Sequence, residues 1–284
     1  MKLIKNLPTI LPVYDNIKNQ NRFKENVKVN CLQPLFSPSN SILPFMMKID
    51  LDSPKPSSWK LYNENGSVFN DISNNIDLLK PVNFEDSKYI YYNGEAMVFK
   101  FESIEEELNV SGNFYFGLIV DGIEYFSEIF AMHPDIKNNI FSDRFVKIEF
   151  WDEVDIEPVR YRKNFKQLIF IDTFIHSSET VIEEETEPDG YENQIPTFQK
   201  MTIKQKLSLL VPDFLKQAIE SVQMHSNVFV NENNKKQGLI DRFKVTPTSE
   251  EFGSLYSLEI ILETDVLMKS GCNENKSIIS ETWN

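Results

Sequence analysis

The residue type in this chain best suited to metal binding or acid–base catalysis is histidine. The sequence contains three, His133, His176 and His225. Each stands alone, and the H-x-H, H-x-x-x-H and H-E-x-x-H spacings that place metal ligands on one face are absent. His225 ends a predicted helix, where the helix dipole favours a positive charge without any catalytic role. The histidines therefore predict no metal site and no catalytic residue.

An acidic run is the strongest charge feature of the sequence. Its members are Glu179, Glu183, Glu184, Glu185, Glu187, Asp189 and Glu192. The offsets that a calcium loop requires are absent, and no cleft is evident for a pair of carboxylates that cleaves glycosides. We interpret residues 177–196 as a solvent-exposed acidic loop. An electrostatic contact to a basic partner and a hydrolase site are the alternatives.

Other signatures of catalysis are missing from the sequence. It contains no Gly-rich phosphate loop, no G-x-S-x-G elbow and no cysteine–histidine nucleophile motif. Cys31 and Cys272 lie near opposite ends, which argues against a structural zinc site and leaves open whether they pair. We therefore expect a protein that is not an enzyme and that holds no cofactor and no metal.

Composition and charge narrow the possible partners. The 284 residues carry a net charge of −14, with a pI near 4.8. Such a surface repels phosphates on average, so we expect no recognition of nucleic-acid sequence; a local basic face around residues 160–166 is the alternative. No apolar run approaches the roughly 18 residues of a membrane helix, and the amino terminus does not match an export signal. We expect synthesis in a cytoplasm and no membrane insertion.

Short strands separated by turns are predicted between residues 31 and 132. Residues 63–66 and the pair Asp121-Gly122 are hairpin turns, each between two strand-like runs. The 22 Phe residues against 9 Gly also favour packed β structure. The predicted fold class is mainly β, with antiparallel β-sandwich or barrel domains. Residues 31–132 form the first domain, and residues 132–142 connect it to the second.

The second predicted domain, residues 143–270, is a β-sandwich with one flanking α-helix over residues 212–225. Phe214, Ala218 and Val222 recur at helical spacing on one face, and Pro212 suits a first turn. Such a helix most simply packs across a sheet. Strands are predicted at residues 144–151, 165–175, 197–207, 227–231 and 254–263, with a polar turn at 231–238.

Both ends of the chain are predicted to lie outside the domains. Residues 1–30 lack clear periodicity, and we interpret them as an extended amino-terminal arm that a partner orders through apolar side chains such as Ile10 and Tyr14. A ragged terminus is the alternative. Residues 271–284 are predicted to form a polar tail.

Several blocks of the sequence resemble a known group of proteins. They are YFSEIF at 125–130, FVKIEFW at 145–151, KQLIFIDTFIH at 166–176, the Glu-rich segment, IPTFQK at 195–200 and VPDFL at 211–215. Their succession resembles virion structural proteins of tailed phages and prophages of Bacteroides-type bacteria, including crAss-like phages. The likeness covers the second half of the chain and the hairpin before it.

The resemblance implies a non-catalytic component of the virion tail, assembled in the host cytoplasm. It implies a tail-tube-like β-sandwich that closes a homo-oligomeric ring, in the neck-to-tail region or the distal tail and baseplate, beside neighbouring tail proteins. The candidate interface residues are Glu183, Glu184, Glu185, Asp189, Phe198, Ile10 and Tyr14.

A carbohydrate- or surface-binding β-sandwich module is the alternative function. Its platform would be formed by exposed aromatic side chains drawn from Trp59, Trp151, Tyr89, Tyr91 and Tyr92. Aromatic residues at strand positions more often belong to a core or an interface.

Overall fold

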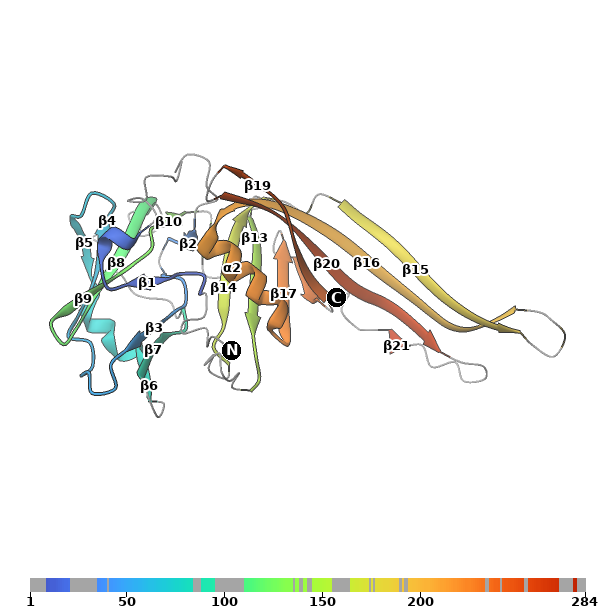
Figure 1. Ribbon diagram of the computed structural model, residues 1–284, viewed down its shortest axis with the longest axis horizontal. Helices are drawn as coiled ribbons and strands as arrows, with labels where there is room; N and C mark the ends of the chain where they lie inside the picture. Colours follow the sequence, from blue (N-terminus) through green and yellow to red (C-terminus); the bar gives the residue numbers. More distant parts are fainter. Residues whose placement is uncertain are drawn as a thin grey trace.

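Figure 1 shows a computed structural model of the protein. The described residues are 9–20, 35–39, 41–83, 88–94, 110–134, 136–137, 140–141, 145–154, 164–173, 175, 177–188, 191, 194–232, 235–240, 242–252, 255–270 and 278–279. Within them the fold is mainly β, with several antiparallel sheets and one α-helix towards the carboxyl-terminal end, which confirms the predicted fold class.

The first half of the chain contributes a seven-stranded sheet. Its strands are β1 (Val13–Tyr14), β2 (Phe36–Pro38), β4 (Ser58–Asn63), β5 (Val68–Asp71), β8 (Gly112–Val120), β9 (Ile123–Ser127) and β10 (Phe130–His133). The pairs are antiparallel except β10 with β2, which is parallel. Both predicted hairpins, β4–β5 and β8–β9, are present. At the second turn Asp121 and Gly122 both have positive φ, 52° and 77°, as a two-residue hairpin turn requires.

A three-stranded sheet packs against this one and completes a sandwich. It consists of β3 (Phe45–Ile49), β7 (Lys88–Tyr92) and β6 (Lys80–Asn83), and the 3₁₀ helix η4 (Ser73–Leu78) precedes β6. Ring contacts cross the interior: Phe45 lies 4.4 Å from Phe116 and 6.0 Å from Trp59, between ring centroids. These large side chains form the core because alternate strand positions face inward.

The alternative of an exposed aromatic platform loses four of its five candidate residues, because the same alternation buries them. Trp59 and Tyr92 are completely buried, and Tyr89 and Tyr91 lie within a second buried cluster. Trp151 is half-buried, and the Lys166 ammonium lies 4.7 Å from the centre of its ring.

Part of the predicted amino-terminal arm belongs to the body of the protein. β1 pairs with β9, and the 3₁₀ helix η1 (Ile17–Asn19) follows it. Ile10 and Leu11 are fully buried, and the Ile10 amide donates to Gln167 Oε1 at 3.3 Å. For residues 9–20, the expectation that a partner orders the arm is therefore wrong, since the chain's own sheet holds them.

The second half begins with a four-stranded sheet in the order β14 (Gln167–Asp172), β13 (Phe145–Trp151), β17 (Asn227–Glu232) and β18 (Lys235–Leu239). β18 falls where a polar turn was predicted at residues 231–238, because backbone pairing with β17 supplies hydrogen bonds that the local composition does not indicate. Phe36 and His133 of the first sheet contact Phe145 at 5.0 and 5.1 Å between ring centroids, so one continuous core joins the two halves. The short strands β11 (Ile136–Lys137) and β12 (Ile140–Phe141) lie in the connecting segment.

The predicted helix is present but shorter. α2 spans Asp213–Ser221 and continues as the 3₁₀ helix η5 (Val222–Met224). Pro212 is its N-cap, and Asp213 in the first turn suits the positive end of the helix dipole. Its buried side chains, Leu215, Ala218 and Ile219, pack against β16, β19 and β20. The helix thus covers one face of a sheet, as predicted.

The longest strands form the last sheet, in the order β15 (Ser177–Pro188), β16 (Gln194–Pro212), β20 (Leu255–Ser270) and β19 (Arg242–Phe252), with β21 (Ile278–Ile279) beside β20. The predicted acidic loop at residues 177–196 is therefore wrong. β15 pairs with β16 from Ser177↔Lys206 to Pro188↔Gln194, so most of the segment is strand. The run of glutamates favoured a loop in the sequence analysis. The strand that pairs with it, β16, is also largely polar, so hydrophobicity did not indicate the pairing.

Figure 1 shows the resulting shape. The sandwich and the helix-covered sheet form a body, and β15 projects from it together with the outer parts of β16 and β20. We call residues 177–188, 194–206 and 261–270 the projecting sheet.

Candidate functional site

The projecting sheet has one face that is held together by ion pairs. Lys204 Nζ lies 3.3 Å from Glu263 Oε1, and Lys200 Nζ lies 2.6 Å from Asp265 Oδ2. Thr202 Oγ1 also donates to Asp265 at 2.9 Å. Burial raises the pKa of Asp265, but the bonds from Lys200 and Thr202 outweigh it and leave that pKa below its usual value. The lysines of β16 are therefore paired towards β20.

β15 and β20 flank β16, so the acidic residues of β15 and the carboxylates of β20 lie on either side of these lysines. In the strand register Glu179 is opposite Lys204 and Glu183 is opposite Lys200, but the lysine ammonium groups contact β20 carboxylates. Glu183, Glu184 and Glu185 are all exposed, and Glu184 accepts a hydrogen bond from Gln199 Nε2 at 2.9 Å. β15 therefore presents an acidic border at the end of the sheet order.

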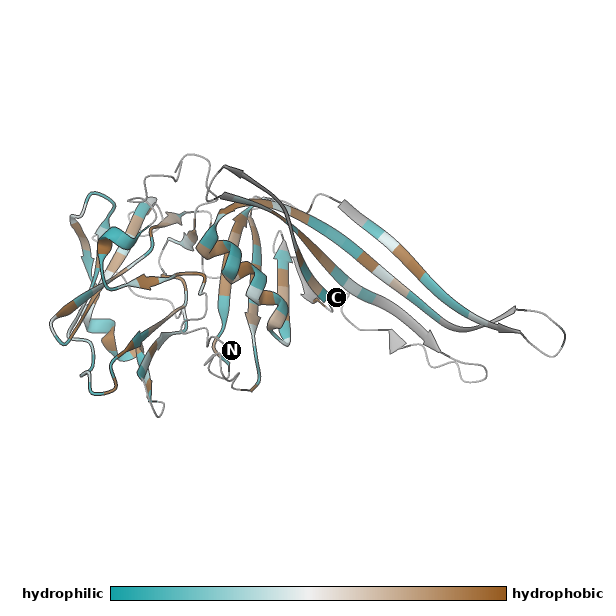
Figure 2. Cartoon of the chain, in the orientation of Figure 1, coloured by the Kyte–Doolittle hydropathy of each residue, from teal (hydrophilic) through white to brown (hydrophobic). Residues whose placement is uncertain are grey.

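The other face of the projecting sheet carries apolar side chains. Ile182 is opposite Met201 in the register, and Ile203 lies two residues further along β16. Ile182 is 68% exposed, whereas Met201 and Ile203 are partly buried. Figure 2 shows a hydrophobic band on β15 in otherwise hydrophilic surroundings.

This apolar face continues the covered face of the body. Leu207, Leu209 and Val211 follow at alternate positions of β16, where α2 packs over the sheet, and all three are buried. α2 packs only on the part of the sheet that belongs to the body, so it leaves the outer part of the same face uncovered. Ile182, Met201 and Ile203 thus form a small apolar surface beside the carboxylates of β15.

The predicted interface residues divide between two places. Glu183, Glu184 and Glu185 lie together on β15, and Phe198 of β16 is opposite Glu185 in the register. Asp189 lies outside the described residues. Ile10 and Tyr14 belong to the body instead, where the Tyr14 hydroxyl donates to Glu128 Oε2 at 3.1 Å. Burial and the Glu128 carboxylate raise the pKa of Tyr14.

Ile182, Met201 and Ile203 were missed by the sequence analysis. The apolar pair Val181-Ile182 interrupts the glutamates and could have indicated a strand, but the acidic composition around it favoured a loop. Only the pairing with β16 places Ile182 and Met201 on one face.

A second cluster contains residue types that occur in hydrolases. Asp152, at the end of β13, is 5% exposed and accepts hydrogen bonds from the Ser226 amide at 2.8 Å and the Ser226 hydroxyl at 3.0 Å. His225 Nδ1 bonds to the other oxygen of the same carboxylate. Burial lowers the pKa of His225 and the Asp152 carboxylate opposes this effect, so the neutral ring is favoured and donates from Nδ1.

The geometry of this cluster does not activate a nucleophile. In a Ser-His-Asp triad the serine hydroxyl donates to the imidazole, whereas here the Ser226 hydroxyl donates to Asp152. The His225 ring packs 4.9 Å from the Phe150 ring in the interior. The cluster instead ties the turn after η5 to the end of β13.

Neither a metal centre nor a membrane-spanning helix is found in the part of the chain that the structure describes. Its His, Cys, Asp and Glu side chains form no group of three or more that could hold a metal ion. None of its helices is both long enough and apolar enough to cross a bilayer.

Comparison of the chain with protein-family models, with curated proteins and with solved structures finds no significant match.

Proposed function

We propose that this protein is a non-catalytic structural component of a phage tail, which assembles into a homo-oligomeric ring through its projecting sheet. The observation that supports this most is the combination of an exposed Ile182 with the exposed glutamates of a strand that leaves the body. In an isolated chain this surface is exposed to water without benefit to folding. In an assembly it is buried and contributes binding free energy.

The physical properties of the sheet agree with a role in assembly. A narrow antiparallel sheet gains stability when one of its faces packs against something else. Here α2 covers the inner part, around Leu207 and Leu209, and leaves the outer part open. The charged border of β15 disfavours uncontrolled pairing of strand edges, because a row of glutamates repels a second row. A specific partner surface is therefore favoured over aggregation.

A ring follows from contacts between unlike surfaces. When one end of a protein binds a different surface of the next copy, the contact repeats until the rotation closes a ring or produces a filament. The projecting sheet lies at one end of the elongated molecule, so its partner surface on the next copy has to lie elsewhere (Figure 1).

The placement in a phage tail rests on the sequence resemblance. The resemblance implies a ring in the neck-to-tail region or at the distal tail and baseplate. It also implies neighbouring tail proteins as further partners and the virion as the location. The burial of aromatic side chains disfavours the carbohydrate-binding alternative, since Trp59 and Tyr91 are 0% and 2% exposed.

Light scattering during size exclusion, together with electron microscopy, tests the proposal. The purified chain is expected to form closed particles with cyclic symmetry, and mass spectrometry of purified virions is expected to detect it. A variant in which Asn-Gly joins Glu179 directly to Lys204, two residues that pair in the register, is expected to remain folded and monomeric. A full-length chain that stays monomeric and is absent from virions would overturn the proposal.

A further inference from the structure

We propose that the projecting sheet of one copy binds a lysine-rimmed pocket at the opposite end of a second copy, with Ile182 entering the pocket and Glu184, on the same face of β15, facing the lysines. This inference rests on the proposed assembly function and specifies its contact.

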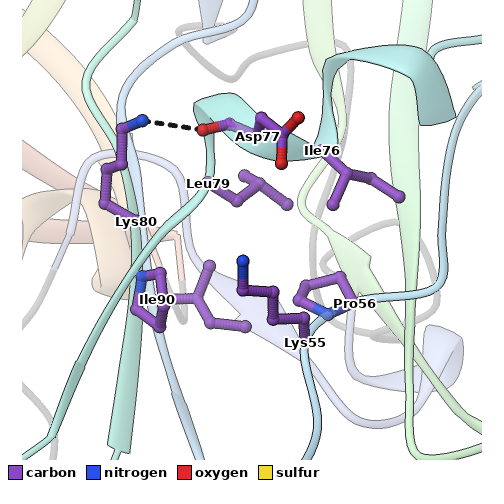
Figure 3. Close-up of a pocket in the computed structure, with 8 residues that line it drawn as sticks. Lys55, Pro56, Ile76, Asp77, Leu79, Lys80 and Ile90 are labelled. Carbon is purple, nitrogen blue, oxygen red and sulfur yellow. Dashed lines mark hydrogen bonds between the residues drawn. The ribbon is translucent and has the colours of Figure 1, made fainter.

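The pocket lies beside η4, β6 and β7 in the first sandwich. It has a volume of about 240 Å³, and its apolar lining includes Ile76, Leu79 and Ile90. Two lysines, Lys55 and Lys80, also line it. Figure 3 shows Lys55 extending between Ile90 and Pro56 towards Leu79.

The charges at the pocket favour an anionic guest. Lys80 Nζ donates to the backbone carbonyl oxygen of Asp77 at 2.8 Å, which holds it at the rim. The Lys55 side chain is exposed. Among the described residues that line the pocket, Asp77 contributes the only carboxylate, so the two ammonium groups outnumber it. A guest that combines an aliphatic side chain with carboxylates matches this lining.

Ile182 and its neighbours have this combination. The Ile182 side chain is 68% exposed, and the exposed Glu184 projects from the same face of β15 two residues on. The size is also suitable: a cavity of roughly 150 Å³ accepts benzene, and the pocket of about 240 Å³ is larger. Burial of the aliphatic group supplies affinity, while pairing of Glu184 with the lysines orients the contact.

The arrangement of the two surfaces requires a second copy. The pocket elements η4, β6 and β7 lie at the end of the body remote from the projecting sheet, so a chain does not reach its own pocket (Figure 1). A symmetric contact between two projecting sheets would bring glutamates together in a chain whose net charge is already −14. Binding of the projecting sheet to the lysine-rimmed pocket avoids that repulsion. The contact then joins one end of a copy to the other end of the next copy.

Two variants and their mixture test the proposal. Ile182→Asp removes the guest, and the double variant Lys55→Glu with Lys80→Glu removes the host. Each variant alone is expected to be monomeric, with self-association weakened by roughly 30-fold or more, as for a central interface residue. An equimolar mixture is expected to give a dimer that grows no further, because one intact sheet then meets one intact pocket. This rescue also shows that both variants are folded.

Matched controls separate this contact from general effects of charge or polarity. Ile123→Asp changes another exposed isoleucine, which is 50% exposed at the β8–β9 hairpin. Lys48→Glu with Lys244→Glu makes the same change in net charge at exposed positions outside the pocket. Both controls are expected to assemble as the unchanged protein does.

The possible results distinguish this inference from the proposed function. Normal assembly of the pocket variant, with failure of Ile182→Asp, would overturn the pocket as the host and support assembly through the sheet. Normal assembly of Ile182→Asp would overturn the inference. An unchanged protein that is monomeric alone but present in virions would reject a second copy as the partner while it supports a place in the tail.

Discussion

At the scale of single residues, the most informative site is the buried carboxylate of Asp152. It accepts hydrogen bonds from the amide and hydroxyl of Ser226 and from His225 Nδ1. A buried charge is tolerated only where such donors replace water. The same residue types that suggest catalysis therefore act here as a structural connection between β13 and β17.

Replacement of Asp152 by Ala is expected to destabilise the fold by about 2–4 kcal/mol, because buried donors lose a charged acceptor. The shift in the urea unfolding midpoint measures this effect. Ser226→Ala removes one hydroxyl bond and is expected to cost about 1 kcal/mol. Equal midpoints for Asp152→Ala and the unchanged protein would contradict the proposed connection.

His225 is expected to make the fold less stable at mildly acidic pH. Its pKa in the folded protein is lowered by burial, against the opposing effect of Asp152. Below about pH 6.5, the unfolded chain binds a proton at this residue more readily than the folded chain does, so stability falls as pH decreases. Urea midpoints at pH 7.5 and 5.5 should differ more for the unchanged protein than for His225→Asn. A variant with an equally large difference would show that His225 is not responsible.

At the scale of elements, the β8–β9 hairpin shows how a turn determines strand pairing. Asp121 and Gly122 both adopt positive φ, and the pairs from Val120↔Ile123 to Gly117↔Phe126 follow in register. Glycine accepts this conformation freely, and Asp does so more readily than most residues. The turn is thus specified by two adjacent residues.

Gly122→Ala is expected to destabilise the hairpin by about 1 kcal/mol, because an L-residue is strained at a φ of +77°. A Cβ at this position would have no neighbour within 4 Å, so the effect isolates the backbone conformation from steric contact. Thermal or urea unfolding measures the change. Asp121→Asn is the control and should have little effect, since Asn also tolerates a positive φ. Equal stability of the unchanged protein and both variants would contradict the role of Gly122 in the turn.

At the scale of the whole molecule, stability is expected to be uneven. The body has a continuous core that joins both halves, whereas the projecting sheet depends on backbone pairing and ion pairs such as Lys204–Glu263. Segments with few buried apolar contacts open locally at low free-energy cost. The region proposed for assembly is thus also the region that assembly can stabilise most.

Hydrogen exchange tests this difference directly. Amides of β15 are expected to exchange about tenfold faster or more than those of β13 in the monomer, because each 1.4 kcal/mol of opening free energy is worth about tenfold. Assembly is expected to slow exchange in β15, whereas exchange in β13 changes little. Equal protection of β15 with and without assembly would argue against the projecting sheet as the contact.

Local sequence patterns determined much of the fold. The turn residues 63–66 and Asp121-Gly122 specified two hairpins, and the spacing of Phe214 and Ala218 specified a helix that covers a sheet. These signals succeed because turn conformation and helical periodicity depend on residues close together in the chain.

Only the tertiary structure decided what depends on distant partners. The acidic segment around Glu183 is a strand because it pairs with β16, which in turn pairs with β20 on its other side. These backbone hydrogen bonds outweigh a weak local preference. Trp59 is buried against the three-stranded sheet of the sandwich, and the segment that contains Tyr14 pairs with β9. Strand partners and the burial of a face are settled by contacts far apart in sequence, so no local pattern could place Ile182 beside Met201 on an open face.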